Sequence, residues 1–72
     1  MTYDRTEAMA SSRRSGCRMA YDHIAKGYGM DWGVAWAKSH ARGQWNDPDV
    51  RDAFVAGYTQ TRKRRERDAR DK

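Results

Sequence analysis

The sequence predicts an all-α protein, a hairpin or small bundle of two or three helices whose basic C-terminal end frays. Three observations support this fold class: one phrase occurs twice, apolar residues recur at helical spacing, and a strong helix-start signal stands near position 47. The phrase runs over 20–28 and again over 50–58, and each copy ends in a Gly-Tyr pair. Two copies of one helical face are a natural way to build a helical hairpin from a short chain.

The first strong helix is predicted from residue 17, at the start of a core domain that spans 17–61. Residues 1–16 are expected to be weakly structured, because serines and Gly16 interrupt helical propensity there. Residues 62–72 are expected to form a basic tail that frays at its end. The apolar stripe of the first helix follows helical spacing and comprises Cys17, Ala20, Tyr21, Ile24 and Tyr28.

Three closely spaced glycines leave two interpretations of the chain after residue 26. Each glycine costs a helix interior up to about 1 kcal/mol relative to alanine. The first interpretation is therefore a break near 27–31, with Asp31 as the N-cap of a second helix. The second is one bent helix over about 17–41. In either case we expect Gly43 to end the element. The stripe that favours the bent helix comprises Trp32, Ala35, Trp36 and Ser39.

Segment 46–49 carries the strongest local signal in the chain. Asp47 suits the N-cap, and Pro48 suits the first helical position, where its missing N–H has no helical partner to lose. Asp49 adds negative charge at the positive end of the helix dipole. The helix that follows is predicted to bury Val50, Phe54, Tyr58 and Thr61, with Ala53 and Gly57 beside this stripe.

The length of the chain predicts a single domain that needs a partner. Its 72 residues make a core that rarely supplies more than about 3–5 kcal/mol. Cys17 is the only cysteine, so no disulfide forms within one chain, and the histidines lack zinc-ligand spacing. We therefore expect a homodimer. No apolar leader and no stretch of roughly 20 apolar residues is present, which with one unpaired cysteine predicts a protein of the bacterial cytoplasm without a membrane span.

The net charge of +5 is concentrated at the two ends of the chain. Residues 1–19 carry a net charge of +2, residues 20–58 one of −1 and residues 59–72 one of +4. Basic ends of this kind attract nucleic acid or an acidic protein face. In a hairpin the start of the first helix lies beside the end of the last, so we expect both clusters to merge. The predicted binding residues are Arg13, Arg14, Arg18, Arg62, Lys63, Arg64, Arg65 and Arg67.

Aromatic residues are candidates for the core and for a protein interface. Aromatic side chains bury 150–250 Å² each in general, and a small core needs such residues. They also anchor protein partners or stack on bases. We expect Tyr28 and Tyr58 to pack their rings and leave their hydroxyls in solvent. The predicted interface residues are Trp32, Trp36, Trp45 and Tyr58.

No residue pattern predicts catalysis. Cys17 and His23 stand six positions apart, on widely separated helix faces, so they cannot act as nucleophile and base. The glycines lack the spacing of a phosphate-binding loop. We expect no enzymatic activity, no metal and no cofactor. A DNA-binding helix-turn-helix is disfavoured as well, because the helix after 43–46 begins with aspartates, the wrong charge for a DNA groove.

Residues 18–62 resemble the ribosome modulation factor family, which comprises short basic bacterial proteins with two helices joined by a linker. Residues 24–28, Ile-Ala-Lys-Gly-Tyr, are similar to the Gly-Tyr signature of that family's first helix. Residues 52–58, followed by Arg62, are similar to the phrase in its second helix. Asn-Asp-Pro at 46–48 stands where the family has a Cys-Pro-Tyr linker. The resemblance implies contact with ribosomal RNA and translational silencing.

The Arg-rich ends and the Ala-, Gly- and Trp-rich composition also resemble small phage-encoded proteins that bind and disable a host machine. Two functional hypotheses result. The first is a non-enzymatic protein that regulates or inhibits a bacterial macromolecular machine, such as the ribosome, through a basic helical surface. The second is a phage-encoded protein–protein inhibitor of a host defence or transcription complex that acts through tryptophan anchors.

Overall fold

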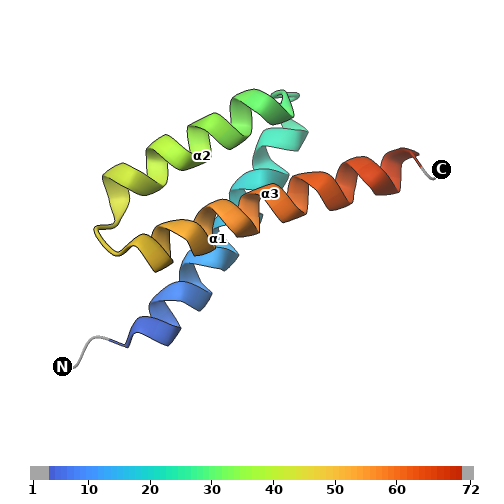
Figure 1. Ribbon diagram of the computed structural model, residues 1–72. Helices are drawn as coiled ribbons and strands as arrows, with labels where there is room; N and C mark the ends of the chain where they lie inside the picture. The colour runs from blue at the N-terminus through green and yellow to red at the C-terminus, as the bar shows by residue number, and fades with distance from the viewer. Residues whose placement is uncertain (1–3, 71–72) are drawn as a thin grey trace.

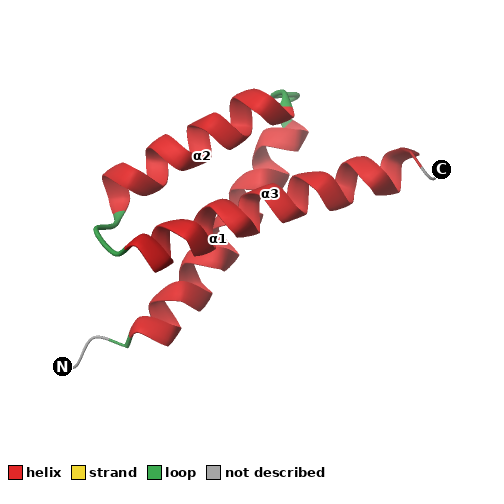
Figure 2. Ribbon diagram, in the orientation of Figure 1, coloured by secondary structure: helices red, strands yellow, loops and turns green. Residues whose placement is uncertain are grey.

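The computed structural model describes residues 4–70, which form three helices joined by two short turns (Figure 1, Figure 2). Helix α1 spans Arg5–Ala25, α2 spans Met30–Gln44 and α3 spans Pro48–Arg70. The predicted all-α class is confirmed, in its three-helix form. The molecule measures 47 × 20 × 16 Å, and it is elongated because the end of α3 extends past the other two helices (Figure 1).

Helix α1 begins earlier than the sequence predicted. The Asp4 side chain caps it by accepting a hydrogen bond from the backbone N–H of Glu7 at 3.2 Å. The expectation of a weakly structured segment over 1–16 is therefore wrong for residues 5–16, and residues 1–3 lie outside the described residues. Tertiary packing overrides the low helix propensity, because Ser12 and Gly16 are buried against α3.

The first turn settles the question that the glycines left open. Gly27 adopts φ 79°, the left-handed conformation that favours glycine. Its N–H donates to the Ile24 carbonyl at 3.1 Å, and the Tyr28 N–H donates to the His23 carbonyl at 3.0 Å. This pair of bonds is a Schellman motif, which ends a helix and turns the chain. The bent continuous helix over 17–41 is therefore wrong, and the break is confirmed.

Helix α2 is bounded by residues other than those predicted. Its N-cap is Gly29, whereas Asp31, the predicted N-cap, lies in the first turn. The helix also continues through Gly43, which was expected to end it, and its C-cap is Trp45. The Arg51 Nε donates to the Trp45 carbonyl at 2.5 Å. An Nη nitrogen of the same side chain lies 3.5 Å from the Arg42 carbonyl, one of the last-turn carbonyls that have no partner within the helix.

The start of α3 and its buried face are as predicted. The Asp47 side chain accepts from the backbone N–H of Asp49 at 2.9 Å, and Pro48 is the first helical residue. The Asp47 carbonyl accepts from the Arg51 N–H at 3.0 Å, the first bond of the helix. The buried residues of α3 include the whole predicted set of Val50, Ala53, Phe54, Gly57, Tyr58 and Thr61.

Helices α1 and α3 run in the same direction and cross each other, and α2, which joins them in the chain, runs in the opposite direction (Figure 1). Residues early in α1 contact residues early in α3, and later residues of α1 contact later residues of α3. Ser12 Oγ donates to the Val50 carbonyl at 2.8 Å, and further along Cys17 Sγ donates to the Gly57 carbonyl at 3.6 Å. The start of α1 therefore lies beside the start of α3. The expected hairpin, with the first helix antiparallel to the last, is wrong.

Small residues let α1 and α3 cross with their backbones in contact. A Cβ at Gly16 would overlap the Phe54 carbonyl, and a Cβ at Gly57 would overlap the Arg13 carbonyl. The buried face of α1 comprises Ser12, Gly16, Ala20 and His23. The larger stripe predicted for this helix is wrong in part, because Tyr21 is 50% exposed.

Small residues on α2 accommodate the large residues of α3. The core cluster joins Ala37 and Ala41 to Phe54 and Tyr58. The Tyr58 hydroxyl occupies the space that a Cβ at Gly33 would need. The stripe predicted for α2 is wrong at its small positions, since Ala35 and Ser39 are exposed while Gly33, Ala37 and Ala41 are buried.

Candidate functional site

A surface groove of about 310 Å³ lies between α1 and the second half of α3, from Gly57 onward. Helix α1 contributes two residues at i, i+4 spacing, and α3 contributes five whose spacing places them on one side of that helix. We call this feature the basic groove. Its lining residues are Arg13, Cys17, Gly57, Gln60, Thr61, Arg64 and Arg67.

The basic groove carries positive charge that its own walls do not neutralise. No acidic side chain lines it. Ion pairs within residues 4–68 use Arg5, Arg14 and Lys26 as their cations. Arg13, Arg64 and Arg67 are exposed and lie outside these pairs. Three guanidinium groups around one concave surface create a strong positive potential there.

The two predicted basic clusters meet only in part. Arg13 shares the groove with Arg64 and Arg67. They meet because α3 is long and crosses α1 near Gly57, and not because opposite chain ends are adjacent. Arg14 instead pairs with Glu7 at 3.5 Å, with both side chains exposed. Arg18 and Lys63 are exposed and do not line the groove.

Arg62 is buried and has a structural role, whereas the residues that follow it, from Lys63 to Arg67, are exposed. Only 9% of Arg62 is exposed. One guanidinium nitrogen donates to the Tyr28 carbonyl at 2.7 Å, and the other donates to the Tyr58 hydroxyl at 3.4 Å. Arg62 thus holds the α1–α2 turn against α3, and its hydrogen-bonding groups are directed into the protein.

The Tyr58 hydroxyl is the centre of a buried hydrogen-bond network. It lies 2.6 Å from His23 Nδ1. The hydroxyl oxygen accepts from Arg62, and its proton is free to be donated to the Nδ1 of a neutral imidazole. Burial lowers the pKa of His23, with a smaller lowering from the Arg62 charge, against an opposing effect of Asp22. This arrangement disfavours a charged imidazole in the folded protein.

The repeated Gly-Tyr phrase has two different structural roles. Gly27 turns the chain at the end of α1, and Tyr28 is 43% exposed. Gly57 lies inside α3 against the α1 backbone, and Tyr58 is fully buried. The expectation that Tyr58 packs its ring is confirmed, whereas its hydroxyl, expected in solvent, is bonded internally. In this structure Tyr58, predicted as an interface residue, offers no exposed surface to a partner.

The three tryptophans divide between the core and the surface. Trp36 packs edge-on against His23 at 4.7 Å between ring centroids, and Trp45 contacts Phe54 at 5.3 Å. Both are partly buried against the core. Trp32 is 52% exposed, and its ring lies 4.7 Å from that of Tyr28.

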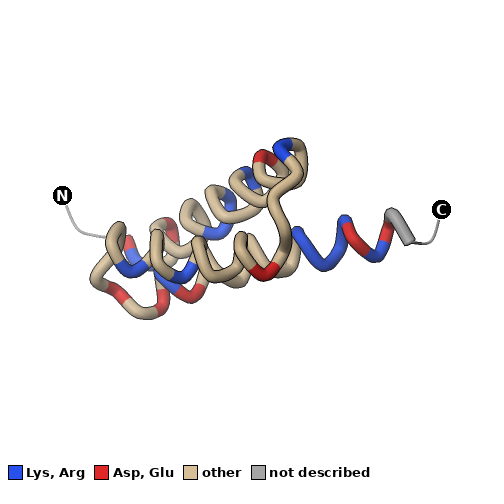
Figure 3. Tube along the Cα trace, turned by 90° about the horizontal axis from the view of Figure 1, so that it is seen from above, with Lys and Arg blue, Asp and Glu red and all other residues tan. Residues whose placement is uncertain are grey.

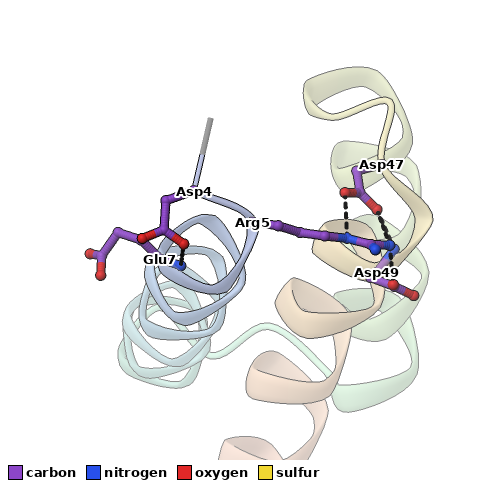
Figure 4. Close-up of polar contacts among 5 residues, drawn as sticks. All are labelled: Asp4, Arg5, Glu7, Asp47 and Asp49. Carbon is purple, nitrogen blue, oxygen red and sulfur yellow. Dashed lines mark hydrogen bonds and ion pairs between the residues drawn. The ribbon is translucent and has the colours of Figure 1, made fainter. Parts of the chain in front are cut away.

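The opposite end of the molecule holds charges that neutralise one another. Arg5 Nε donates to Asp47 at 3.0 Å, and the same guanidinium contacts Asp49 (Figure 4). The backbone N–H of Asp49 and the Arg5 charge hold the pKa of Asp47 below its ordinary value. Figure 3 shows mixed signs over the start of α3 and a preponderance of basic residues over its far part.

Within the described part of the chain, no group of three histidine, cysteine or acidic residues is arranged to hold a metal ion. None of the described helices has the length and apolar character needed to cross a bilayer.

Four uncharged residues that line the groove were not among the predicted binding residues: Cys17, Gly57, Gln60 and Thr61. Gln60 and Thr61 precede the basic run, and Cys17 was assigned to an apolar stripe. Their signal is the i, i+4 spacing of Cys17 from Arg13 and of Gln60 from Arg64. That spacing places each residue beside an arginine once both elements are helices.

Comparison of this chain with protein-family models, with curated proteins and with solved structures finds no match.

Proposed function

We propose that this chain is a non-enzymatic binding protein that contacts the phosphate groups of a nucleic acid through the basic groove and the exposed part of α3. The observation that carries the proposal is the convergence of Arg13, Arg64 and Arg67 from two helices on one concave surface without an acidic wall. Guanidinium groups bind phosphate oxygens through paired, charge-assisted hydrogen bonds. A phosphate in the groove would offset the mutual repulsion of these arginines.

Ribosomal RNA in the bacterial cytoplasm is the proposed target, and regulation of the ribosome is the proposed outcome. Two observations support this choice: the basic groove suits a phosphate backbone, and the two Gly-Tyr phrases resemble those of the ribosome modulation factor family. The homodimer expected from the short chain stays a prediction, and a dimer would present two such grooves to one target.

A capture experiment from bacterial lysate tests the proposal. The tagged protein is compared with the double variant Arg64→Ser/Arg67→Ser and with the control Lys38→Ser/Arg42→Ser. The control removes the same charge from exposed positions of α2 that do not line the groove. We expect the wild type and the control to retain ribosomal RNA at low salt, and the groove variant to lose it.

Nuclease treatment and high salt distinguish a nucleic-acid partner from a protein partner. Captured material should disappear after nuclease treatment and at high salt, since phosphate contacts depend steeply on salt. Equal RNA recovery with the groove variant and with its control would reject the basic groove as the binding surface.

The exposed aromatic pair supports a second candidate function. Tyr28 and Trp32 are 43% and 52% exposed, and their rings are in contact. Such a pair can anchor a protein partner, as expected of a phage-encoded inhibitor of a host defence or transcription complex. Under this alternative, Trp32→Ala would abolish capture of a protein that resists both nuclease and salt, and Arg64→Ser/Arg67→Ser would change only its association rate.

A further inference from the structure

Tyr21 extends the row of α1 residues that lines the basic groove. Arg13 and Cys17 line the groove, and Tyr21 follows at the next i+4 position. Four helical residues advance by about 6 Å, so the ring stands one turn beyond the groove on the same side of α1. Tyr21 is 50% exposed, although a tyrosine ring is a large apolar surface.

Arg65 holds the Tyr21 ring next to the charges of α3. Its guanidinium carbon lies 5.5 Å from the ring centroid, within the range of a cation–π contact. Arg65 follows Arg64 in the chain, so this contact joins the ring to the helix that supplies most of the groove. The site therefore combines guanidinium groups with a flat aromatic surface that the fold leaves half open to solvent.

We infer that the ligand of the basic groove is a single-stranded nucleic acid, with an unpaired base stacked on Tyr21 while a neighbouring phosphate lies among Arg13, Arg64 and Arg67. The inference rests on the proposed function and specifies its ligand class. Combined stacking surfaces and basic grooves are how proteins bind single strands without reading sequence. A duplex keeps its bases paired inside, so it can use the arginines but not the Tyr21 ring.

Fluorescence anisotropy with labelled oligonucleotides tests the inference. The probes are a uridine 12-mer, a thymidine 12-mer and an RNA duplex of 12 base pairs, all at one salt concentration. The wild type should bind the single strands at least about tenfold more tightly than the duplex. Tyr21→Leu should weaken single-strand binding roughly five- to hundredfold, the range for loss of one stacked base, and should leave duplex affinity unchanged.

Three further variants identify the cause of any loss. Tyr21→Phe keeps the ring and should bind like the wild type. Tyr28→Leu removes an equally exposed tyrosine outside the groove and should also bind like the wild type. Arg65→Gln removes both a charge and the contact that holds the Tyr21 ring, so it should weaken duplex binding and should weaken single-strand binding more. Circular dichroism melts check that each variant is folded.

The outcomes separate this inference from the proposed function. Equal affinity for single strand and duplex, together with an unchanged Tyr21→Leu variant, would overturn the inference. The proposed function would survive that result if Arg64→Ser/Arg67→Ser still lost binding to both. Absence of binding to every probe would overturn both.

Discussion

The inner part of α3, residues 48–62, packs against α1 and α2, whereas most of the outer part, residues 63–70, extends beyond them (Figure 1). The inner part buries small and aromatic residues, and five successive side chains from Lys63 to Arg67 in the outer part are exposed. One continuous helix therefore serves both as a core element and as a projecting basic surface. Substitutions in the inner part should therefore affect mainly the stability of the protein, and substitutions in the outer part should affect mainly its binding.

The largest expected loss of stability follows from Gly57→Ala in the inner part. The new Cβ would overlap the Arg13 carbonyl, and two packed backbones cannot yield as a flexible side chain can. We expect a loss of roughly 3 kcal/mol, at the upper end for overpacking, and a melting temperature lower by about 10 °C or more.

Gly43→Ala is the matched control, since it makes the same change inside another helix. Nothing lies within 4 Å of a Cβ at Gly43, so this variant should be more stable by about 0.5–1 kcal/mol. Thermal melts followed by circular dichroism measure both effects. Equal effects at the two positions would contradict the close crossing of α1 and α3.

Tyr58→Phe should have the next largest effect. It removes the hydroxyl that contacts both His23 Nδ1 and Arg62 and leaves two buried polar groups without this partner. The expected cost is about 1–2 kcal/mol, measured by urea unfolding. Tyr28→Phe removes a hydroxyl from an exposed tyrosine and should change stability by less than about 0.5 kcal/mol. A similar cost for both variants would refute the buried network.

The pH dependence of stability reports on His23 of α1, which contacts Tyr58 in the inner part of α3. Because the pKa of His23 is lowered in the folded protein, the unfolded chain binds the proton more readily. Stability is therefore full above the unfolded value of about 6.5 and falls as the pH drops below it, by up to about 1.4 kcal/mol per unit. Asp47, whose pKa is lowered from 3.8, affects stability only in a more acidic range.

Urea titrations at pH 7.5 and 5.5 measure this slope. His23→Gln should flatten the dependence of stability on pH. The other described groups whose pKa the fold alters, Arg5, Lys26 and Asp47, titrate outside this pH range. Stability that stays constant or rises on acidification of the wild type would show that the buried imidazole carries no such penalty.

The sequence predicted the start and the buried face of α3 well. It predicted poorly the buried faces of α1 and α2, which pack against α3. The Asp-Pro start and the stripe of Val50, Phe54 and Tyr58 were readable because capping and large apolar residues give strong local signals. The buried faces of α1 and α2 consist largely of serine, glycine and alanine. These residues are buried for their small size, and a hydrophobicity pattern does not detect that requirement.

The candidate site was predictable in composition but not in arrangement. The arginines were recognisable from the charge distribution. The break at Gly27 adds a helix between the first and the last and so makes α1 and α3 parallel. This topology brings Arg13 to the groove and buries Arg62, whereas Arg14 pairs with Glu7 of its own helix. Only tertiary structure separates the roles of Arg13 and Arg62, because both residues are arginines in basic runs.

The smallest effect on stability is expected from the three arginines that line the basic groove. Arg13→Ser/Arg64→Ser/Arg67→Ser removes exposed side chains and should change stability by no more than about 0.5 kcal/mol per site. Binding should respond strongly. The most direct test is the slope of log K against log salt concentration for a single-stranded RNA. If each arginine contacts one phosphate, the triple variant should bind more weakly with a slope flatter by about 2. An unchanged affinity and slope would contradict the central claim that the basic groove binds phosphate.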